Sequence, residues 1–346
     1  MREVLIKAIP FDDLKITELE GVQQVNEHGE LVFSGLMRGE KESEYISWAL
    51  KKNPLVSVNV CSDSGEEKIL FQGVLVDFEI QAQNDVRYLT GVLRTNTYLL
   101  DLIPHKRSFQ ADRLQYPNLL TNVNNGYTDS IFIMAKGAGS NIPGLVMQYD
   151  ETDWAFIKRM ASRFHTVVIP DSQRDHIAYT FGLPEDGVHY AVETNIFSIA
   201  KNAGQIIESE DQRMPRADTF FYVLNSREIY RLGDCVTLNG VPLRVYSIKT
   251  KMEGSELYHT YYLTSESGFE TEEVFNENLI GLSLDAQVTS VERDTVQVLI
   301  GCDENQAGCG TRVFPYATVY STPDGTGWYC MPEIGDAVRL YFPCEK

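Results

Sequence analysis

The sequence of 346 residues lacks any long hydrophobic run, and no stretch approaches the ~20 apolar residues that a membrane-spanning helix needs. Its N-terminal stretch, MREVLIKAIPFDDLK, also lacks the apolar core of a signal peptide. We therefore expect no stable membrane anchoring and no export by the secretory route. The length allows about two to four compact domains.

Motifs that mark common enzymes are also missing. The sequence contains no H-E-x-x-H and no G-x-S-x-G, and its six histidines are scattered without helical metal-ligand spacing. The glycine-rich stretch AKGAGS (135–140) is followed by neither Lys-Ser/Thr nor a helix, so a flexible loop is predicted instead of a phosphate loop. Glu151 and Asp153 imitate a glycosidase pair, but helix capping explains both acids. We expect no catalytic activity and no cofactor.

The cysteines form no recognisable metal-binding pattern. Of the six, Cys302 and Cys309 are separated by six residues, and Cys330 and Cys344 follow. A zinc site built from these four is an open alternative, but the spacing lacks the short C-x₂₋₄-C knuckle of structural zinc. Free cysteines are therefore predicted, and no metal.

Positive charge is scarce. The formal net charge is −19, with 49 Asp and Glu against 30 Lys and Arg. Phosphate backbones and anionic membranes both require clustered positive charge. The composition therefore argues against nucleic-acid recognition and against a membrane surface, and it favours a solvated acidic face.

Most of the chain has the alternating pattern of β-strands separated by turns. NEHGE (26–30) and the Asn239-Gly240 pair are each flanked by alternating apolar residues and predict hairpins. Residues 43–53 predict a short helix that ends before Pro54.

One stretch, QYDETDWAFIKRMASRF (148–164), predicts a well-capped amphipathic helix. Asp150 or Thr152 caps it, and Glu151 and Asp153 fall in the first turn, where acids suit the helix dipole. Lys158, Arg159 and Arg163 are expected to face away from the core. The apolar stripe predicted to pack on a sheet consists of Phe156, Ile157, Met160, Ala161 and Phe164.

The C-terminal 65 or so residues predict about four short, evenly spaced strands, which is typical of a small barrel of OB type. LGDCV (232–236) and IGDAV (334–338) share one predicted structure, a Gly-Asp turn that is followed directly by an apolar strand.

Four stretches, in order, resemble the hub and spike proteins of contractile injection systems: the late-control D proteins of tailed phages, the valine-glycine repeat proteins of type VI secretion, and the hubs of R-type bacteriocins. KRSFQ (106–110) is similar to the family's Arg-x-Phe-Gln signature, and residues 148–164 to its Q-Y-x-E-T-D-x-x-F-x-x-R segment. Residues 232–263 resemble the strand pair before the spike, and GWYCMPEIGDAVRLYFP (327–343) resembles the spike-base OB stretch. The resemblance covers residues ~70–346. The motif residues are Arg107, Phe109, Gln110, Tyr149, Glu151, Asp153, Phe156, Arg159, Gly233, Asp234, Trp328, Pro332, Gly335 and Asp336.

The resemblance implies a mainly β chain with two hub β-barrels, an α+β clip region between them and an OB-fold spike base. The implied domains are a first barrel (1–105), the clip (106–185) with a helix at 150–164, a second barrel (186–275) and the OB domain (276–346). An OB barrel needs five strands, so the last domain is expected to be incomplete. Either the spike is a separate chain, or this chain is shortened; the second is favoured because an open barrel exposes a sheet edge.

The implied function is structural: a homotrimeric baseplate hub that joins a hexameric inner tube to the membrane-piercing spike. The implied partners are two further copies, the tube or tube-initiator protein, baseplate wedge proteins, the spike tip and the tape measure. Assembly is expected in the bacterial cytoplasm, into a virion, a bacteriocin or a secretion apparatus.

Two alternatives stay open. One is a tail-associated enzyme that degrades cell walls. The other is a receptor- or carbohydrate-binding module, for which the aromatic strand around Tyr258 and Tyr262 could serve. The oligomeric state distinguishes these three hypotheses, because only the hub hypothesis requires a trimer.

Overall fold

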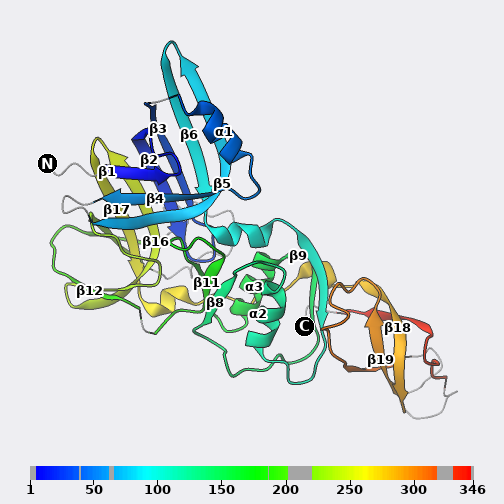
Figure 1. Cartoon of the computed structure of the whole chain (residues 1–346). Coiled ribbons are helices and arrows are strands. Elements are labelled where there is room, and N and C mark those ends of the chain that lie inside the picture. The colour runs from blue at the N-terminus through cyan, green and yellow to red at the C-terminus, as the bar shows by residue number, and fades with distance from the viewer. Residues whose placement is uncertain are drawn as a thin grey trace. The chain divides into compact units, whose positions relative to one another are not determined.

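The computed structural model describes residues 5–38, 40–61, 66–185, 187–201, 220–317 and 330–343. Within these ranges the chain is mainly β, with short helices between strands. No helix in the described part is long and apolar enough to cross a membrane. The chain divides into two compact units, which are considered separately (Figure 1).

Unit 1 comprises Met1–Leu100, Tyr127–Lys136 and Met160–Glu273. Its largest feature is a twelve-stranded sheet whose main path runs β1-β4-β5-β6-β3-β2-β16-β17-β14-β13, with β15 beside β16 and β12 beside β15. These strands are β1 (Leu5–Ile9), β2 (Leu14–Gln24), β3 (Glu30–Met37), β4 (Leu55–Cys61), β5 (Glu67–Gln83), β6 (Val86–Arg94), β12 (His189–Val192), β13 (Ser198–Lys201), β14 (Phe220–Ser226), β15 (Cys235–Leu238), β16 (Val241–Glu253) and β17 (Glu256–Thr264).

The sheet consists of two groups of strands joined at one place. In the first group β1 also contacts β2, so the two ends of the strand series β1-β4-β5-β6-β3-β2 come together. β2 then pairs antiparallel with β16 of the second group, with Gln23 opposite Ile248 and Gly21 opposite Thr250. We call this β2–β16 pairing the seam.

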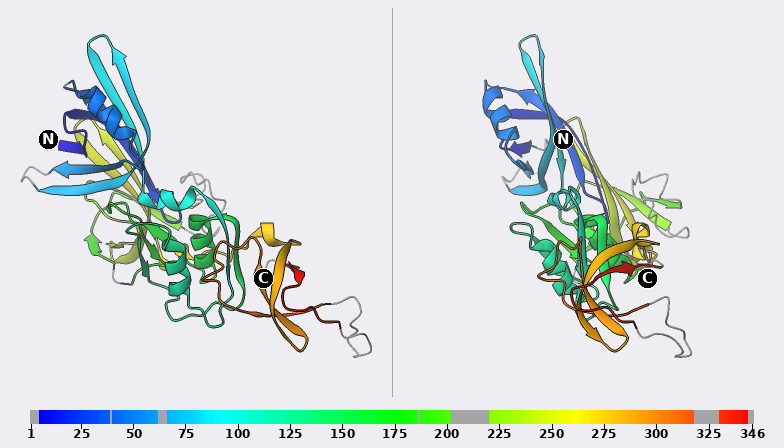
Figure 2. Two further views of the ribbon diagram at one scale, coloured as in Figure 1. Left: turned by 45° about the vertical axis from the view of Figure 1, so that its right-hand side comes forward. Right: turned by 90° about the vertical axis from the view of Figure 1, so that its right-hand side faces the viewer.

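Each strand group has its own hydrophobic core. The first buries Phe11, Phe33 and Phe71, and α1 (Glu42–Ala49) contributes Tyr45 to it. The second buries Phe221 and Tyr261. The two predicted hairpins and the predicted short helix are confirmed, and Asn239 and Gly240 both adopt the positive φ of a tight hairpin turn (49° and 82°). Figure 2 shows the β5–β6 hairpin extending past the neighbouring strands of its group.

Unit 1 also holds a small three-stranded sheet, ordered β10-β11-β8. In it β11 (Ala178–Phe181) pairs antiparallel with β10 (Val168–Pro170) and parallel with β8 (Ile131–Met134). The remaining short elements along the chain are the 3₁₀ turns η1 (Asn96–Asp101), η2 (Glu266–Phe269) and η3 (Glu277–Leu279).

Unit 2 comprises Asp101–Gly126, Gly137–Arg159 and Val274–Lys346. It contains a two-stranded sheet of β7 (Pro104–Phe109) and β9 (Val146–Thr152), and the helix α2 (Tyr116–Asn124). It also contains a four-stranded antiparallel sheet ordered β20-β19-β18-β21. Its strands are β18 (Ser283–Glu292), β19 (Thr295–Ile300), β20 (Val313–Pro315) and β21 (Ala337–Tyr341). These match the four strands predicted near the C-terminus.

The predicted helix over 148–164 is too long. Residues Val146–Thr152 form strand β9, and α3 runs only from Asp153 to Ser162. The backbone of this stretch pairs with β7, from Phe109 opposite Val146 to Pro104 opposite Thr152. That pairing satisfies its N–H and C=O groups, so the strand prevails over the helical pattern.

The helix packs as predicted at its centre but not at its end. Phe156, Ile157 and Met160 are fully buried, and Phe156 stacks on Phe109 of β7 with ring centroids 5.7 Å apart. Phe164 lies beyond the helix, is only partly buried, and meets Phe181 edge-on.

The two units are built from interleaved segments, and the division falls inside α3, after Arg159. The four consecutive domains predicted from the sequence, including two barrels and an OB fold, therefore stay a prediction.

Replacing Phe156 by Ala is expected to lower the free energy of unfolding by ~3–5 kcal/mol, because the ring is fully buried against Phe109. Chemical denaturation measures the change. The control is Ile103→Ala, at a side chain that is 61% exposed, where a change within about 0.5 kcal/mol is expected. A loss below ~1 kcal/mol for Phe156→Ala would show that the ring is not a core residue.

Candidate functional site

Most of the family-motif residues of unit 2 meet around the β7–β9 pair. Arg107 and Phe109 lie on β7, and Tyr149 and Glu151 lie on β9. Arg107 stands directly opposite Gln148. Asp153, Phe156 and Arg159 follow on α3. The antiparallel pairing therefore brings together two motifs that are about forty residues apart in the sequence.

The carboxylate of Asp153 is the most deeply buried charge of this cluster, with 0% of the side chain exposed. Arg107 Nη1 donates to its Oδ1 at 2.7 Å, and Gln148 Nε2 donates to the same oxygen at 2.9 Å. His105 Nε2 lies 3.8 Å from the other oxygen, Oδ2. A buried carboxylate is tolerable only with such partners, so Asp153 fixes the positions of the side chains around it.

A second ion pair joins the strand to the helix. Arg159 Nε and Nη2 donate to Glu151 Oε1 and Oε2 at 2.9 and 2.8 Å, and Nη2 also donates to the carbonyl of Met147 at 2.8 Å. Only 4% of Arg159 is exposed, and its guanidinium lies 5.2 Å from the centre of the Phe156 ring. The planar, two-pronged geometry suits arginine and not lysine.

These contacts correct the interpretation of Glu151 as a first-turn acid and of Arg159 as facing away from the core, whereas Asp153 does lie in the first turn of α3 as predicted. Glu151 is on a strand and pairs with Arg159, while Asp153 pairs with Arg107. The cap was predicted correctly: Thr152 Oγ1 accepts the backbone N–H of Ala155 at 3.2 Å. Helical periodicity could not reveal partners that come from another strand.

The other edge of β7 is occupied by the loop 301–310, which the sequence did not identify as part of a site. Asp303 Oδ1 accepts the backbone N–H of Ser108 at 2.9 Å, and Asp303 Oδ2 accepts its hydroxyl. Glu304 N–H donates to the carbonyl of Lys106 at 2.7 Å, and Asn305 Nδ2 donates to that of Ser108 at 2.9 Å. The loop thus substitutes for a third strand beside β7.

Gln110, the last residue of the first motif, extends this docking. Its backbone N–H donates to the carbonyl of Cys309 at 2.6 Å, and its Nε2 donates to Ser108 Oγ at 3.0 Å. Gly310 must be glycine, because its φ is +74° and a Cβ there would clash with Ala111. The stretch CDENQAGC, which lies in the connection between β19 and β20, therefore docks on β7 within unit 2. We call the docked loop, the two ion pairs and the Phe109–Phe156 stack the interlock.

Two of the four cysteines of the zinc alternative lie in this loop. Cys302 and Cys309 are free thiols, and burial raises the pKa of each. No group of three His, Cys, Asp or Glu that could hold a metal occurs among the described residues. Cys344 of the zinc alternative lies outside them.

The two Gly-Asp motifs form the same turn, as predicted. Gly233 and Gly335 have φ values of +81° and +97°. In each turn the aspartate carboxylate accepts a backbone N–H three residues earlier, at 2.8 Å: Asp234 from Arg231, and Asp336 from Glu333. Burial raises the pKa of Asp234. Strands β15 and β21 begin on the next residue, so these motif residues set strand starts.

The remaining motif residues lie apart from the interlock's buried centre. The Lys106 ammonium lies 5.0 Å from the ring centre of Tyr149, and the carbonyl of Tyr149 accepts from Asn276 Nδ2 at 2.9 Å. Pro332 is partly exposed in the segment before β21. Trp328 lies outside the described residues.

The two ion pairs of the interlock engage both of their carboxylates. Asp153 is fully buried on Arg107, and both oxygens of Glu151 are bonded to Arg159. The arrangement is suited to fixing the relative positions of strands, a helix and a loop.

Replacing Arg107 by Met is expected to lower the free energy of unfolding by ~3–5 kcal/mol, because it removes the arginine that forms an ion pair with the fully buried Asp153 carboxylate. Asp153→Asn should also destabilise, and the double variant should lose much less than the sum of the two. Chemical denaturation of the four proteins gives the coupling.

The control is Lys41→Met, which breaks the solvent-exposed pair with Asp12 and should leave the denaturation midpoint nearly unchanged. Strict additivity of Arg107→Met and Asp153→Asn would contradict the coupled-pair description.

Comparison with known proteins gives structural matches only. No family model matches the sequence, and no curated protein matches it by sequence. The Escherichia coli protein c3393, a type VI secretion component described as structurally similar to the T4 bacteriophage tail proteins gp27 and gp5, matches with a TM-score of 0.64 at 12% identity, over 90% of this chain and 93% of that one.

Two further structures agree. The 43 kDa tail protein of prophage MuSo2 from Shewanella oneidensis matches with a TM-score of 0.56 at 10% identity, over 78% of this chain and 100% of its own. A Francisella PdpA–VgrG complex matches with a TM-score of 0.58 at 9% identity, over 98% of this chain and 76% of that one. The resemblance inferred from the motifs is thus confirmed at the level of the fold, and this chain has the fold shared by these phage-tail and type VI secretion proteins.

Proposed function

We propose that this protein is a structural hub of a contractile tail or secretion baseplate, and that it acts as a homotrimer between an inner tube and a spike. The observation that supports this most is the match over 90% of the chain to a type VI component that is itself similar to tail proteins. The four motifs found in the sequence point to the same group independently.

The two strand groups of unit 1 support the ring geometry that such a hub needs. Each has its own core, and the seam joins them as one continuous sheet. In the proposal each group is one barrel, so three copies present six similar barrels to a hexameric tube.

The interlock supports a role in carrying force. The loop between β19 and β20 is bonded to β7 through Asp303, Glu304 and Asn305, which ties the four-stranded sheet to the clip-like strands within unit 2. In the proposal the four-stranded sheet is the OB-type base of the spike, and a spike base must not shear from its hub when the tail contracts.

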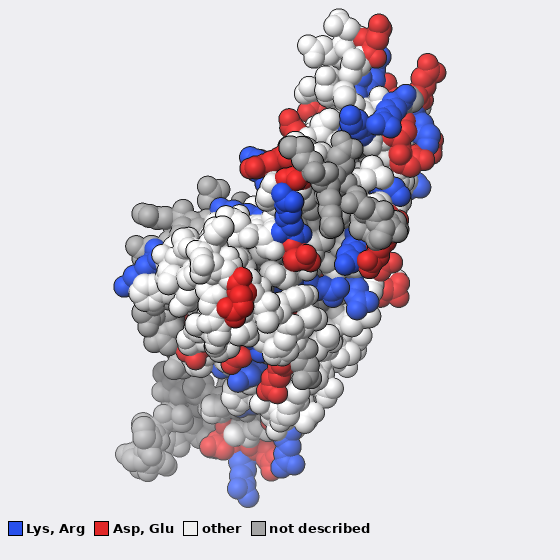
Figure 3. Space-filling model, turned by 90° about the vertical axis from the view of Figure 1, so that its left-hand side faces the viewer, with Lys and Arg blue, Asp and Glu red and all other residues white. Residues whose placement is uncertain are grey.

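The proposed partners are the tube or tube-initiator protein, baseplate wedge proteins, the spike tip and the tape measure, with assembly in the bacterial cytoplasm. Figure 3 shows one face on which uncharged side chains cover a broad area and charged ones gather elsewhere. For a chain of net charge −19, contact between copies is most favourable through such uncharged surface.

The isolated chain is expected to form a trimer that weakens as salt is lowered. Three copies each carry −19 formal charges, and their repulsion is screened beyond about 8 Å at ~0.15 M salt. Sedimentation at ~0.05 and ~0.5 M salt measures this. Dissociation on raising salt would refute the charge argument alone, while a monomer at micromolar concentration in every salt would remove the hub proposal for the isolated chain.

The alternative hypothesis, a tail-associated enzyme that degrades cell walls, can also be tested. We propose that the chain has no hydrolase activity. Purified protein is expected to leave peptidoglycan intact, as measured by release of soluble fragments. Turnover that is abolished by Glu151→Gln, in a variant with an unchanged circular dichroism spectrum, would overturn this proposal.

A further inference from the structure

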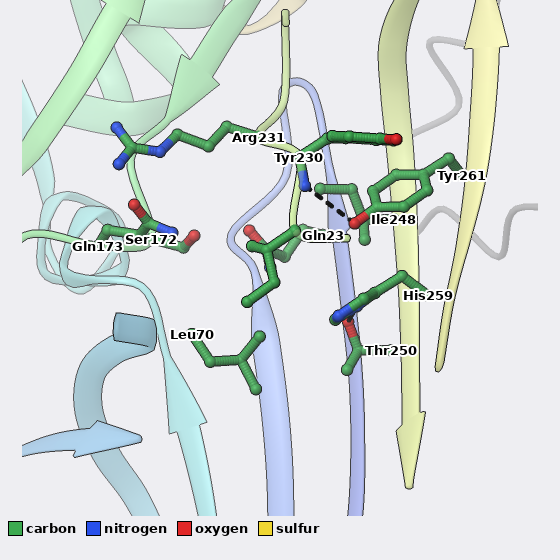
Figure 4. Close-up of a pocket in the computed structure, with 11 residues that line it drawn as sticks. Gln23, Leu70, Ser172, Gln173, Tyr230, Arg231, Ile248, Thr250, His259 and Tyr261 are labelled. Carbon is green, nitrogen blue, oxygen red and sulfur yellow. Dashed lines mark hydrogen bonds between the residues drawn. The ribbon is translucent and has the colours of Figure 1, made fainter. Parts of the chain in front are cut away.

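A small cavity lies inside unit 1, beside the seam. Its volume is about 10 Å³, close to the minimum that one water molecule occupies. Strands β2, β16 and β17 enclose it together with the segments around Ser172 and Tyr230 (Figure 4). The polar side chains of Gln23, Ser172 and Gln173 line it, so it is not an apolar void.

His259 of β17 is the buried titratable base of this cavity, with 1% of the residue exposed. It stands opposite Thr250 of β16, and its Nδ1 lies 2.9 Å from Thr250 Oγ1. Its second ring nitrogen, Nε2, has no hydrogen-bond partner among the described residues. A buried polar atom without a partner is unfavourable, so a water molecule that hydrogen-bonds Nε2 would stabilise the fold.

Among the described residues that line the cavity, none is an Asp or Glu that could stabilise a positive charge on the imidazole. The charged or titratable groups among the lining residues besides His259 are Tyr230, Arg231 and Tyr261. The Tyr261 hydroxyl accepts the N–H of Tyr230 at 3.0 Å and donates to the carbonyl of Glu228 at 2.6 Å. The Arg231 guanidinium lies on the far side of the cavity from His259 in Figure 4, and its charge opposes a second cation. Thr250 of β16, Gln23 of β2 and Leu70 of β5 bring no charge.

We propose that the cavity binds one water molecule that hydrogen-bonds Nε2 of His259, and that this hydrated, neutral histidine makes the seam sensitive to acid. Protonation of His259 places an uncompensated charge beside the pairing of β2 and β16. Acid then loosens the β2–β16 pairing that joins the two strand groups of the sheet.

The direction of the pH effect follows from burial. Burial lowers the pKa of His259 from 6.5 to about 4. Between these values the unfolded chain binds a proton there that the folded chain does not, so stability falls as the pH drops through this window. Above about pH 6.5 His259 does not change the stability of the fold, and below about pH 4 the loss of stability that it causes is complete. One such proton lowers the folding equilibrium constant by about tenfold per pH unit.

The water is tested by a high-resolution crystal structure of the full chain at neutral pH. An ordered water about 2.7–3.2 Å from Nε2 is expected. A dry cavity, or a protein atom bonded to Nε2, would overturn the hydration site.

The acid sensitivity is tested by denaturation midpoints between pH 7 and 4.5, comparing wild type with His259→Leu and with His189→Leu. His189 is an exposed histidine on β12 and serves as the matched control. The steep loss below pH 6.5 should persist in His189→Leu and flatten in His259→Leu. An equal slope in all three proteins would refute the proposal.

If His259→Leu does not fold, ¹⁵N shifts of the histidine rings in wild-type protein decide the question. One ring, that of His259, should stay neutral down to about pH 5. Titration of all six rings near 6.5 would overturn the acid-sensitive role.

Discussion

The buried carboxylate of Asp153 is the constraint around which unit 2 is arranged. A charge with no solvent exposure requires a cation and donors at fixed positions, and Arg107 and Gln148 supply them at 2.7 and 2.9 Å. Arg107 reaches Asp153 only because β7 pairs with β9 in one register. The start of α3, the strand register and the Phe109–Phe156 stack are therefore linked to one ion pair.

The docked loop extends that arrangement to the C-terminal sheet. A strand pair as short as β7–β9 leaves one edge of β7 with unpaired backbone groups, which is costly when buried. Asp303, Glu304 and Asn305 satisfy these groups with side-chain and backbone contacts. Because the loop connects β19 to β20, the four-stranded sheet is attached at an interior point and not only through its chain ends. This attachment is a physical reason for unit 2 to respond to force as a single rigid part.

Unit 1 obeys a different constraint, the continuity of its sheet. The two strand groups bury separate sets of aromatic side chains, yet β2 and β16 pair across the seam. The cavity beside the seam holds polar groups of both strand groups, including Gln23 and His259. A charge that appears beside the seam would therefore disturb the pairing that joins the two strand groups.

The sequence by itself determined the features that depend on neighbouring residues. The Asn239-Gly240 hairpin, the turns at Gly233-Asp234 and Gly335-Asp336, the Thr152 cap and the apolar centre of α3 all follow from local backbone preference and periodicity. Several strands could also be predicted along the chain, and the four motifs pointed to the group of proteins that share this fold.

Only the tertiary structure decided which residues meet. Glu151 lies on a strand and Arg159 is buried because β7, forty residues earlier, supplies hydrogen bonds that outweigh the helical pattern. The role of CDENQAGC in docking on β7 and the unpaired Nε2 of His259 likewise depend on partners distant in the chain. Local periodicity carries no information on such partners, because a strand's register and a buried charge's counter-ion are fixed only when the chain has folded.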